Sequence, residues 1–283
     1  MKSFLTLFIF LSTNILQGQR HFYMSAFGGA SLYKGDLGSV TMPFKKPKGV
    51  VGAGMVFELN PRMLVRAELN YGKVSGSDKL SVKNKHRNLD FTSSVTEAAL
   101  SFEYILFDLY EYKVSPYLFA GIGTFKFSPY TFDSKGNQLM LAELSTEGQG
   151  FYENRKNYRL QQLAIPFGGG LQWALSPKIR LLLEAGIRKT NTDYLDDVST
   201  TYIDKQLLEQ NRGSTAVGIA FRTDELDAGT PYPADGTVRG NPNNNDWYIF
   251  TGLHFRISLQ PKMRQVRYTY KPKRAKLSCP VVF

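Results

Sequence analysis

The sequence contains a single cysteine, Cys279, among its 283 residues. It therefore cannot build an internal disulfide framework or a multi-thiolate metal site. Histidine is scarce as well, and His21, His86 and His254 are scattered, with no carboxylate or cysteine at ligand spacing. No P-loop, Rossmann or serine-hydrolase signature occurs. We therefore expect no catalytic residue, no cofactor and no metal, and we predict that the protein is not an enzyme.

Long apolar runs are also missing after the N-terminus. No later stretch offers the roughly 20 uninterrupted apolar residues that a membrane-spanning helix needs. Residues 1–19 combine Lys2, an apolar stretch at 4–16 and the small residue Gly18. This pattern predicts a secretory signal peptide and is less typical of a buried N-terminal helix. If the mature protein enters a membrane, it must do so with strands.

What the sequence does contain is a repeated alternation of apolar and polar side chains. In residues 163–188 the alternation has a period of two on both sides of Ser176-Pro177-Lys178, which predicts a β-hairpin. One face of this hairpin is apolar, and the other carries charge and glycine. Residues 116–127 are apolar or glycine on both faces, so their orientation cannot be assigned. Eight strands are predicted, at residues 21–33, 49–59, 63–71, 96–106, 116–127, 163–175, 179–188 and 246–259.

The connections between these strands alternate between short and long, and the two longest span residues 128–159 and 191–245. This asymmetry predicts an eight-stranded antiparallel transmembrane β-barrel of the outer membrane at residues 20–260, with long extracellular loops and both termini periplasmic. A soluble β-sandwich is the alternative, but it does not explain the loop asymmetry. Apolar residues at 139–144 and 194–208 predict that the long loops fold over the barrel mouth or dock to a partner.

The charged face of each strand would point into the lumen of such a barrel, where an eight-strand wall leaves room for side chains and not for a pore. The inward charges mix both signs, so we expect a paired network that plugs the lumen. The predicted network consists of Glu58, Arg66, Glu68, Glu97, Glu103, Arg180, Glu184, Arg188 and Arg256.

Charge outside the strands is uneven. The net charge is +11, and the segment 261–283 carries cations but no acid. Because a signal peptide makes nucleic acid an improbable partner, we interpret this segment as a periplasmic tail that docks to an acidic or apolar protein surface. A solvated extension and binding to phospholipid head groups are the alternatives. The tail cations are Lys262, Arg264, Arg267, Lys271, Lys273, Arg274 and Lys276.

The long loops contain acids that could suggest a Ca²⁺ site, namely Asp193, Asp196 and Asp197 with Glu209. The regular spacing of a calcium-binding loop is absent, so a structural or solvated role is favoured.

Two loop runs resemble a known family: Thr146-Glu147-Gly148-Gln149-Gly150 and Thr192-Asp193-Tyr194-Leu195-Asp196-Asp197-Val198-Ser199-Thr200. They are similar to the PorG-type outer-membrane proteins of Bacteroidota, which belong to the type IX secretion and gliding-motility machinery. Shorter matching stretches lie at 33–37, 116–123, 165–168, 239–240 and 246–248.

This resemblance implies an eight-strand barrel in outer-membrane lipid that associates with the periplasmic ring of the PorK lipoprotein and PorN, and with other outer-membrane proteins of the machinery. It carries over no catalytic residue. The alternative function is a stand-alone OmpA-like surface barrel that binds a ligand or host molecule through its extracellular loops.

Overall fold

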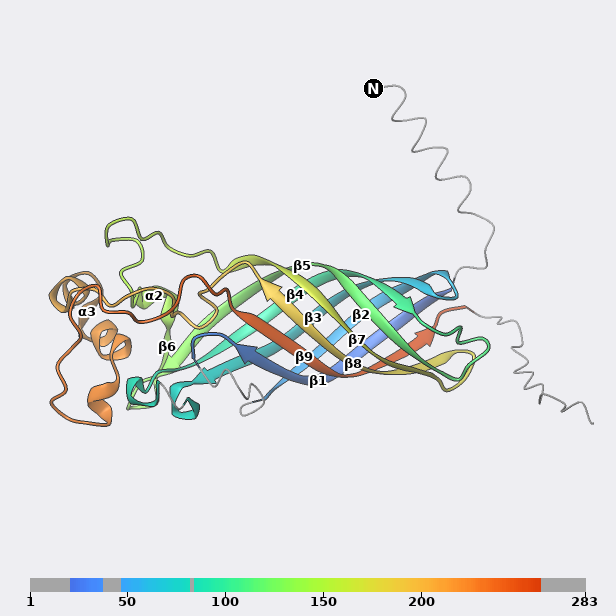
Figure 1. Ribbon diagram of the computed structural model, residues 1–283, viewed down its shortest axis with the longest axis horizontal. Coiled ribbons are helices and arrows are strands. Elements are labelled where there is room, and N and C mark those ends of the chain that lie inside the picture. The colour runs from blue at the N-terminus through green and yellow to red at the C-terminus, as the bar shows by residue number, and fades with distance from the viewer. Residues whose placement is uncertain (1–20, 38–46, 82–83, 261–283) are drawn as a thin grey trace, which may run out of the picture.

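The computed structural model describes residues 21–37, 47–81 and 84–260 of the chain, so the predicted signal peptide and tail lie outside the described residues. Long strands form a tilted barrel with tight turns at one end and large loops at the other (Figure 1). The long strands are β1 (Phe22–Lys34), β2 (Lys48–Asn60), β3 (Met63–Ser77), β4 (Asp90–Ile105), β5 (Val114–Phe132), β7 (Gln161–Ala174), β8 (Ile179–Thr190) and β9 (Trp247–Ser258).

Each long strand pairs antiparallel with the next one along the chain, and β9 pairs with β1 to close the ring. A short strand, β6 (Gln138–Met140), pairs with residues 130–132 at the end of β5 and adds a small hairpin to the wall. The closed eight-strand antiparallel barrel confirms the predicted fold class. Among the described residues, no helix is both long enough and apolar enough to span a membrane.

Three strands extend further toward the large loops than the sequence pattern predicts. β3 continues to Ser77, β4 begins at Asp90, and β5 continues to Phe132. These extensions contain serine and threonine where the alternation of apolar residues has ended. Beyond the lipid a strand needs no apolar face, so the backbone ladder persists where the hydrophobic pattern stops.

The tight turns at the opposite end are stabilised by side chains that accept backbone hydrogen bonds. The Asn60 side chain accepts from the amides of Arg62 and Met63, both at 2.9 Å. Ser176 Oγ accepts from Ile179 N at 3.1 Å, and Asp108 Oδ1 accepts from Tyr110 N at 2.8 Å. Such local bonds explain why short polar sequences reverse the chain here.

The structure assigns the facing of β5, which the sequence left open. Leu118 and Ile122 are 61% and 69% exposed on the outer wall, whereas Phe119 and Phe125 are buried in the lumen. A Cβ atom on Gly186 would lie 2.5 Å from the Phe119 ring, so this glycine makes room for the aromatic side chain. The aromatic side chains of β5 thus fill the lumen, and Gly186 on β8 leaves the space that Phe119 needs.

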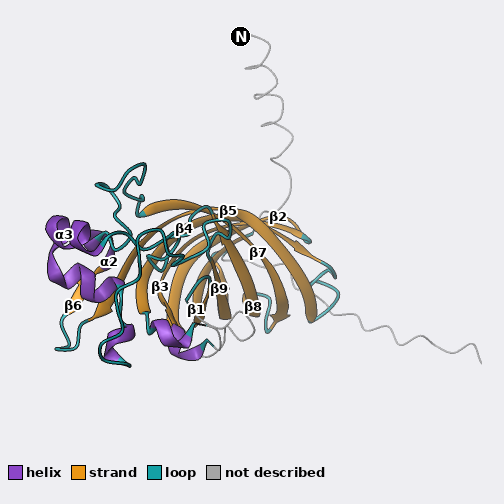
Figure 2. Ribbon diagram, turned by 60° about the vertical axis from the view of Figure 1, so that its left-hand side comes forward, coloured by secondary structure: helices purple, strands orange, loops and turns teal. Residues whose placement is uncertain are grey.

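The large loops fold into a dome over one mouth of the barrel, formed by residues 133–160 and 191–246 (Figure 2). Its helices are α2 (Leu141–Leu144), α3 (Lys205–Ala220) and the 3₁₀ turn η4 (Thr223–Glu225). The β3–β4 loop adds the 3₁₀ turns η2 (Asp78–Leu80) and η3 (Lys85–Arg87) beside it. The dome has its own apolar core, in which Ile203 and Leu208 are fully buried among Ala216, Val217 and Ala220.

Candidate functional site

The inward faces of the strands place all nine residues of the predicted charge network inside the barrel. Each is buried, and Glu68, the most exposed of them, keeps only 6% of its surface accessible. The outer wall at the same depth is apolar, with Leu69, Leu183 and Leu253 exposed. The wall therefore meets lipid while the charges meet one another.

In the middle of the lumen the charges form a continuous chain of ion pairs. Arg256 donates from both terminal nitrogens to the two Glu103 oxygens, at 2.8 and 2.7 Å. Arg66 Nη1 lies 3.1 Å from Glu103 and 2.7 Å from Glu184. His254, which the predicted network did not include, has its ring nitrogens within 3.4 Å of Glu68 and Glu184. Its position two residues before Arg256 on β9 was the signal for its inward facing.

Two further carboxylates anchor the ends of this network. Near the turns, Glu58 accepts from Arg180 at 2.9 Å, from Tyr23 at 3.0 Å and from Tyr110 at 2.9 Å.

Near the dome, Glu97 accepts from Tyr248 at 2.6 Å, from Asn70 at 3.1 Å and from Arg188 at 3.4 Å. The carboxylates thus accept hydrogen bonds from arginines and tyrosines at several depths of the barrel. We interpret these charges as structural, because each is paired inside the lumen.

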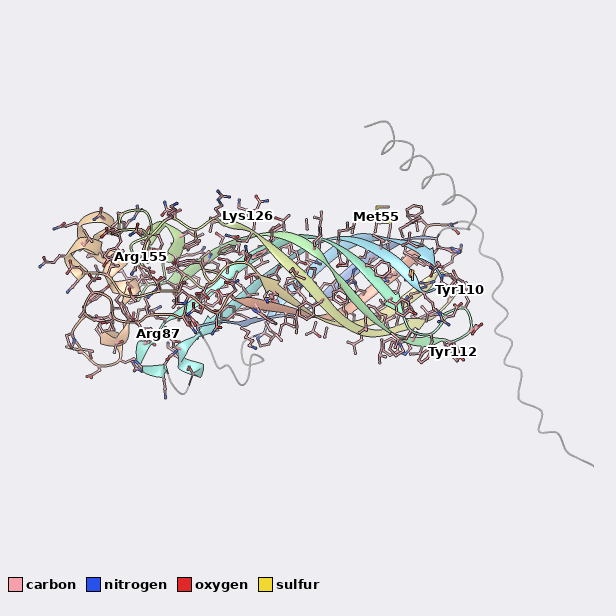
Figure 3. The ribbon with its side chains drawn as sticks, turned by 45° about the horizontal axis from the view of Figure 1, so that its top comes forward. Met55, Arg87, Tyr110, Tyr112, Lys126 and Arg155 are labelled. Carbon is pink, nitrogen blue, oxygen red and sulfur yellow. The ribbon has the colours of Figure 1, made fainter. Side chains whose placement is uncertain are left out.

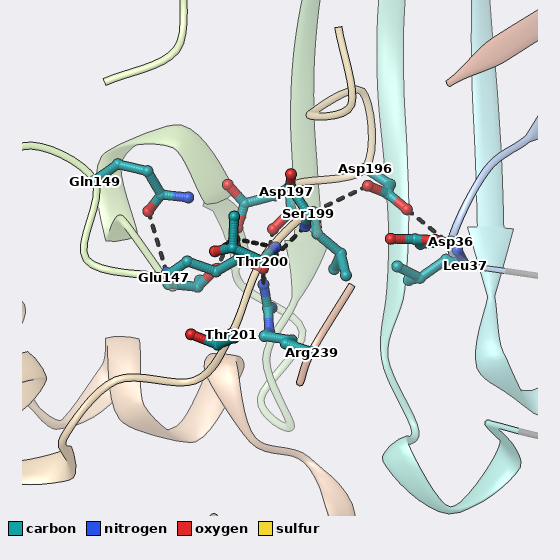
Figure 4. Close-up of polar contacts among 12 residues, drawn as sticks. Asp36, Leu37, Glu147, Gln149, Asp196, Asp197, Ser199, Thr200, Thr201 and Arg239 are labelled. Atoms are coloured by element: carbon teal, nitrogen blue, oxygen red, sulfur yellow. Dashed lines mark hydrogen bonds and ion pairs between the residues drawn. The ribbon is translucent and has the colours of Figure 1, made fainter. Parts of the chain in front are cut away.

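Under the dome, segments that are far apart in the sequence meet in a second buried cluster, which we call the dome cluster (Figure 4). It centres on Glu147, which is fully buried. The Glu147 carboxylate accepts from the amides of Ser199 and Thr200, at 3.0 and 2.9 Å, and from Arg239 Nη1 at 2.9 Å. Arg239 also donates to the carbonyl of Asp197 at 2.8 Å. Burial opposes the charge of Arg239, but Glu147 and Asp197 outweigh it and raise the pKa of the guanidinium.

The backbone conformation of the run 146–150 positions the Glu147 side chain. Gly148 and Gly150 have φ values of 81° and 93°, a conformation that favours glycine. Gln149 Oε1 accepts from the Glu147 amide at 3.1 Å, and Thr146 Oγ1 donates to Asp197 at 2.6 Å. Each residue of this run therefore has a structural task in the dome cluster.

The second run brings Asp196 to a tyrosine hydroxyl that also contacts Asp246, the residue before β9. Tyr33, at the end of β1, has its hydroxyl 2.6 Å from Asp196 Oδ2 and 2.8 Å from Asp246 Oδ1. A phenol carries one proton and can donate to only one of them. The other contact is a hydrogen bond only if that carboxyl donates a proton itself. We conclude that Asp196 and Asp246 share one proton across Tyr33.

The remaining residues of the second run pack around this pair. Leu195 is fully buried, and its amide donates to Asp246 Oδ2 at 2.9 Å. Tyr194 stacks on Tyr158 with ring centroids 4.7 Å apart, and the Thr192 hydroxyl accepts from the Tyr194 amide at 3.2 Å.

The run also contains three aspartates that are hard to ionise. Burial raises the pKa of Asp193 to about 9, that of Asp196 to about 8 and that of Asp197 to about 7. Asp193 is 7% exposed, and neither of its carboxyl oxygens has a hydrogen-bond partner among the described residues. Burial outweighs the favourable effect of the nearby Ser199 side chain on the carboxylate, so the neutral acid is favoured.

Sequence reasoning missed several side chains that complete the dome cluster. Arg155 donates to the carbonyl of Thr201 at 2.9 Å, and Tyr158 donates to Asp197 Oδ1 at 2.7 Å. Arg87, from η3 in the β3–β4 loop, pairs with Asp78 at 2.6 Å and donates to the carbonyl of Arg239. Most of their partners lie tens of residues away, so no local pattern pointed to them.

The acidic residues considered above for Ca²⁺ do not come together at one site. Asp196 and Asp197 are buried and hydrogen-bonded within the dome, whereas Glu209 lies exposed on α3. Within residues 21–37, 47–81 and 84–260, no group of three or more His, Cys, Asp or Glu is arranged to hold a metal ion.

An apolar lipid-facing wall, an ion-paired lumen and full closure define a transmembrane β-barrel of the outer-membrane class. The family model described as "Domain of unknown function (DUF6089)" matches residues 1–215, and the chain belongs to this family. No curated protein matches the sequence.

Several solved outer-membrane barrels are similar to this chain. Neisserial surface protein A is 11% identical, over 83% of this chain and 96% of its own, with a TM-score of 0.41. The attachment invasion locus protein Ail of Yersinia pestis is 12% identical, over 85% and 99%, with a TM-score of 0.39. A major outer-membrane protein of Thermus thermophilus is 14% identical, over 85% and 100%, with a TM-score of 0.41. Likeness at this level says nothing about function, which must come from the residues of this chain.

The central ion pairs generate a first prediction. Glu103→Gln should leave Arg256 buried without its only acidic partner among the described residues and destabilise the barrel by about 3–5 kcal/mol. The matched double variant Glu103→Gln with Arg256→Gln should recover part of this loss. The measurement is urea unfolding in lipid vesicles, followed by the heat-modifiable mobility of the barrel on gels. Equal stability of wild type and Glu103→Gln would show that this pair is not important for folding.

The neutral aspartates generate a prediction about pH. Their folded pKa values lie above the unfolded value, so the folded dome binds more protons than the unfolded loops at pH values between about 4 and 9. The dome should therefore be most stable at low pH and lose stability as the pH rises toward 9. The measurement is the rate of trypsin cleavage in the dome, divided by the rate for an unfolded peptide at the same pH.

The control for this experiment is Asp193→Asn, which removes the ionisable group but keeps its shape. Cleavage of this variant should rise less between pH 6 and pH 9 than cleavage of the wild type. A wild-type dome that becomes more resistant as the pH rises would contradict the prediction.

Proposed function

We propose that this protein is a non-enzymatic outer-membrane component of the type IX protein secretion machinery, which supports protein export and gliding motility. We further propose that it associates with the periplasmic ring of PorK and PorN, next to other outer-membrane proteins of the machinery. The observation that carries this proposal is the convergence of the PorG-like runs, 146–150 and 192–200, with Tyr33, Arg239 and Asp246 in one buried cluster.

This convergence matters because a resemblance between short runs is weak when each run stands alone. Here the matching residues form one another's hydrogen-bond partners: Glu147 with Ser199 and Thr200, and Asp196 with Tyr33. The resemblance therefore extends to the residues that shape the dome, beyond a general barrel pattern. Paired charges along the lumen favour a scaffold over a conducting pore.

A stand-alone surface barrel that binds a ligand through its loops is the second candidate function. The observation in its favour is an ordered dome that still exposes apolar side chains, with Val238 76% and Leu226 57% accessible. Exposed apolar side chains on a folded loop surface are typical of contact sites. The two candidates differ in where the partner binds, on the periplasmic tail in the first and on the dome in the second.

The proposed topology has the dome outside the cell and both chain ends in the periplasm. Phe22 and Leu259 lie together at the turn end of the barrel, where the Leu259 amide donates to the Phe22 carbonyl at 2.8 Å. In a Cys279→Ser background, a cysteine at Asn244 should react with an impermeant maleimide on intact cells. A cysteine at Lys273 should react only after the outer membrane is permeabilised, and equal labelling of both would contradict this topology.

The docking role of the tail can be tested by deleting residues 261–283, which lie outside the described residues and beyond the end of β9. The truncated protein should still insert into the outer membrane, because the strands are intact, but should lose PorK and PorN when purified from native membranes. A matched variant keeps the tail length and replaces its seven cations by glutamine. If PorK and PorN are lost from both variants, the positive charge of the tail is what binds them.

Two other outcomes count against the proposal. Normal secretion and normal co-purification of the ring with the truncated protein would refute the docking role. If the full-length protein also brings down no ring protein, the secretion assignment fails and the surface-barrel function is favoured.

A further inference from the structure

The outer wall of the barrel carries lysines near the dome, above an apolar band. These lysines are exposed at strand positions that face away from the lumen, and Figure 3 shows Lys126 projecting from the wall. They are Lys34 on β1, Lys73 on β3, Lys126 on β5 and Lys189 on β8. Below them the outward residues of the same strands are apolar, for example Ile122, Leu69 and Leu183. The lysines thus mark the level at which lipid head groups begin.

Two of these lysines share one aromatic ring. Trp247, the first residue of β9, is the register partner of Lys34 on β1 and of Lys189 on β8. The two ammonium nitrogens lie 5.6 and 5.8 Å from the centroid of the Trp247 ring. Both distances are within the usual range of a cation–π contact.

These two cations have no acid to neutralise them within the part of the chain that the structure describes. The ion pairs found there are formed by arginines and His254, and neither Lys34 nor Lys189 takes part in them. Two positive charges beside one ring repel each other, and an anion within reach of both would relieve the repulsion. Trp247 also meets Phe167 edge to face at 6.5 Å, and from there toward the turn end the apolar wall continues through the exposed register partners Leu171 and Leu183.

We propose that Lys34, Trp247 and Lys189 form a binding site for the phosphate of a phosphorylated lipid in the membrane leaflet on the dome side. The ammonium groups, which come from the two strands that flank β9, bind the phosphate beside the Trp247 ring, and the acyl chains lie along the wall below Phe167. The apolar wall directly beneath the cations selects a lipid over a free phosphate ion. This site depends on the membrane class of the fold and is independent of the secretion machinery.

The test uses the full-length protein in dodecylmaltoside micelles with Trp173→Phe, so that Trp247 is the one remaining tryptophan. Its fluorescence is followed during titration with diphosphorylated lipid A. The double variant Lys34→Gln with Lys189→Gln should lower the affinity by at least about tenfold, because each cation near an anionic lipid contributes to binding. Gel mobility before and after heating checks that each variant is folded.

The matched control is Lys73→Gln with Lys126→Gln, which removes the same charge from two other exposed positions on the outer wall. It should change the affinity by less than the first pair does. An equal loss in both double variants would show diffuse attraction to the lipid and overturn the site. Equal binding of dephosphorylated lipid A, or displacement of the lipid by millimolar inorganic phosphate, would overturn the assignment to a lipid phosphate.

Discussion

The buried ion pairs of the lumen are the interaction on which the rest of the structure depends. A charge on the lipid face at mid-depth costs about 2–4 kcal/mol, so every charged residue of the central strands must face inward. Inside, a single charge would be still more costly, and each needs a partner on another strand. Arg66 on β3 therefore meets Glu184 on β8, across the barrel and not along the wall. These cross-lumen contacts constrain the facing of the five strands that carry the charges, β2, β3, β4, β8 and β9.

The dome follows a different rule, because there acids outnumber bases. Glu147 is neutralised by Arg239, but Asp193, Asp196 and Asp246 have no arginine of their own among their hydrogen-bond partners in the described dome. The structure accommodates them as neutral or proton-sharing acids, with Tyr33 between two of them. The dome is thus joined to β1 and β9 by a bond that depends on a proton, whereas the lumen is held by charges.

Strand facing was largely predictable from the sequence because lipid on one side and a filled lumen on the other enforce an alternation with a period of two. The sequence pattern could not predict features on which lipid and lumen impose no alternation. β5 was ambiguous because Phe119 and Phe125 are as apolar as the lipid-facing Ile122. What favours the inward position for Phe119 is the space left by Gly186 on a strand far away in the sequence. The partners of each charge were not predictable either, since the tilt of the strands decides which inward residues meet. In the dome, the partners of the Glu147 carboxylate lie more than fifty residues away and follow no period.

The distribution of cations over the molecule is itself informative about function. The arginines on the barrel strands face inward, where pairing with carboxylates offsets their burial, as for Arg256 and Glu103. The lysines at the dome-side edge of the apolar wall point outward and take no part in the ion pairs of the described residues. If positive charge served solubility alone, either residue type would suit either place. The sorting instead separates charge that stabilises the barrel from charge that is available to an external anion, and Lys34 and Lys189 beside Trp247 belong to the second kind.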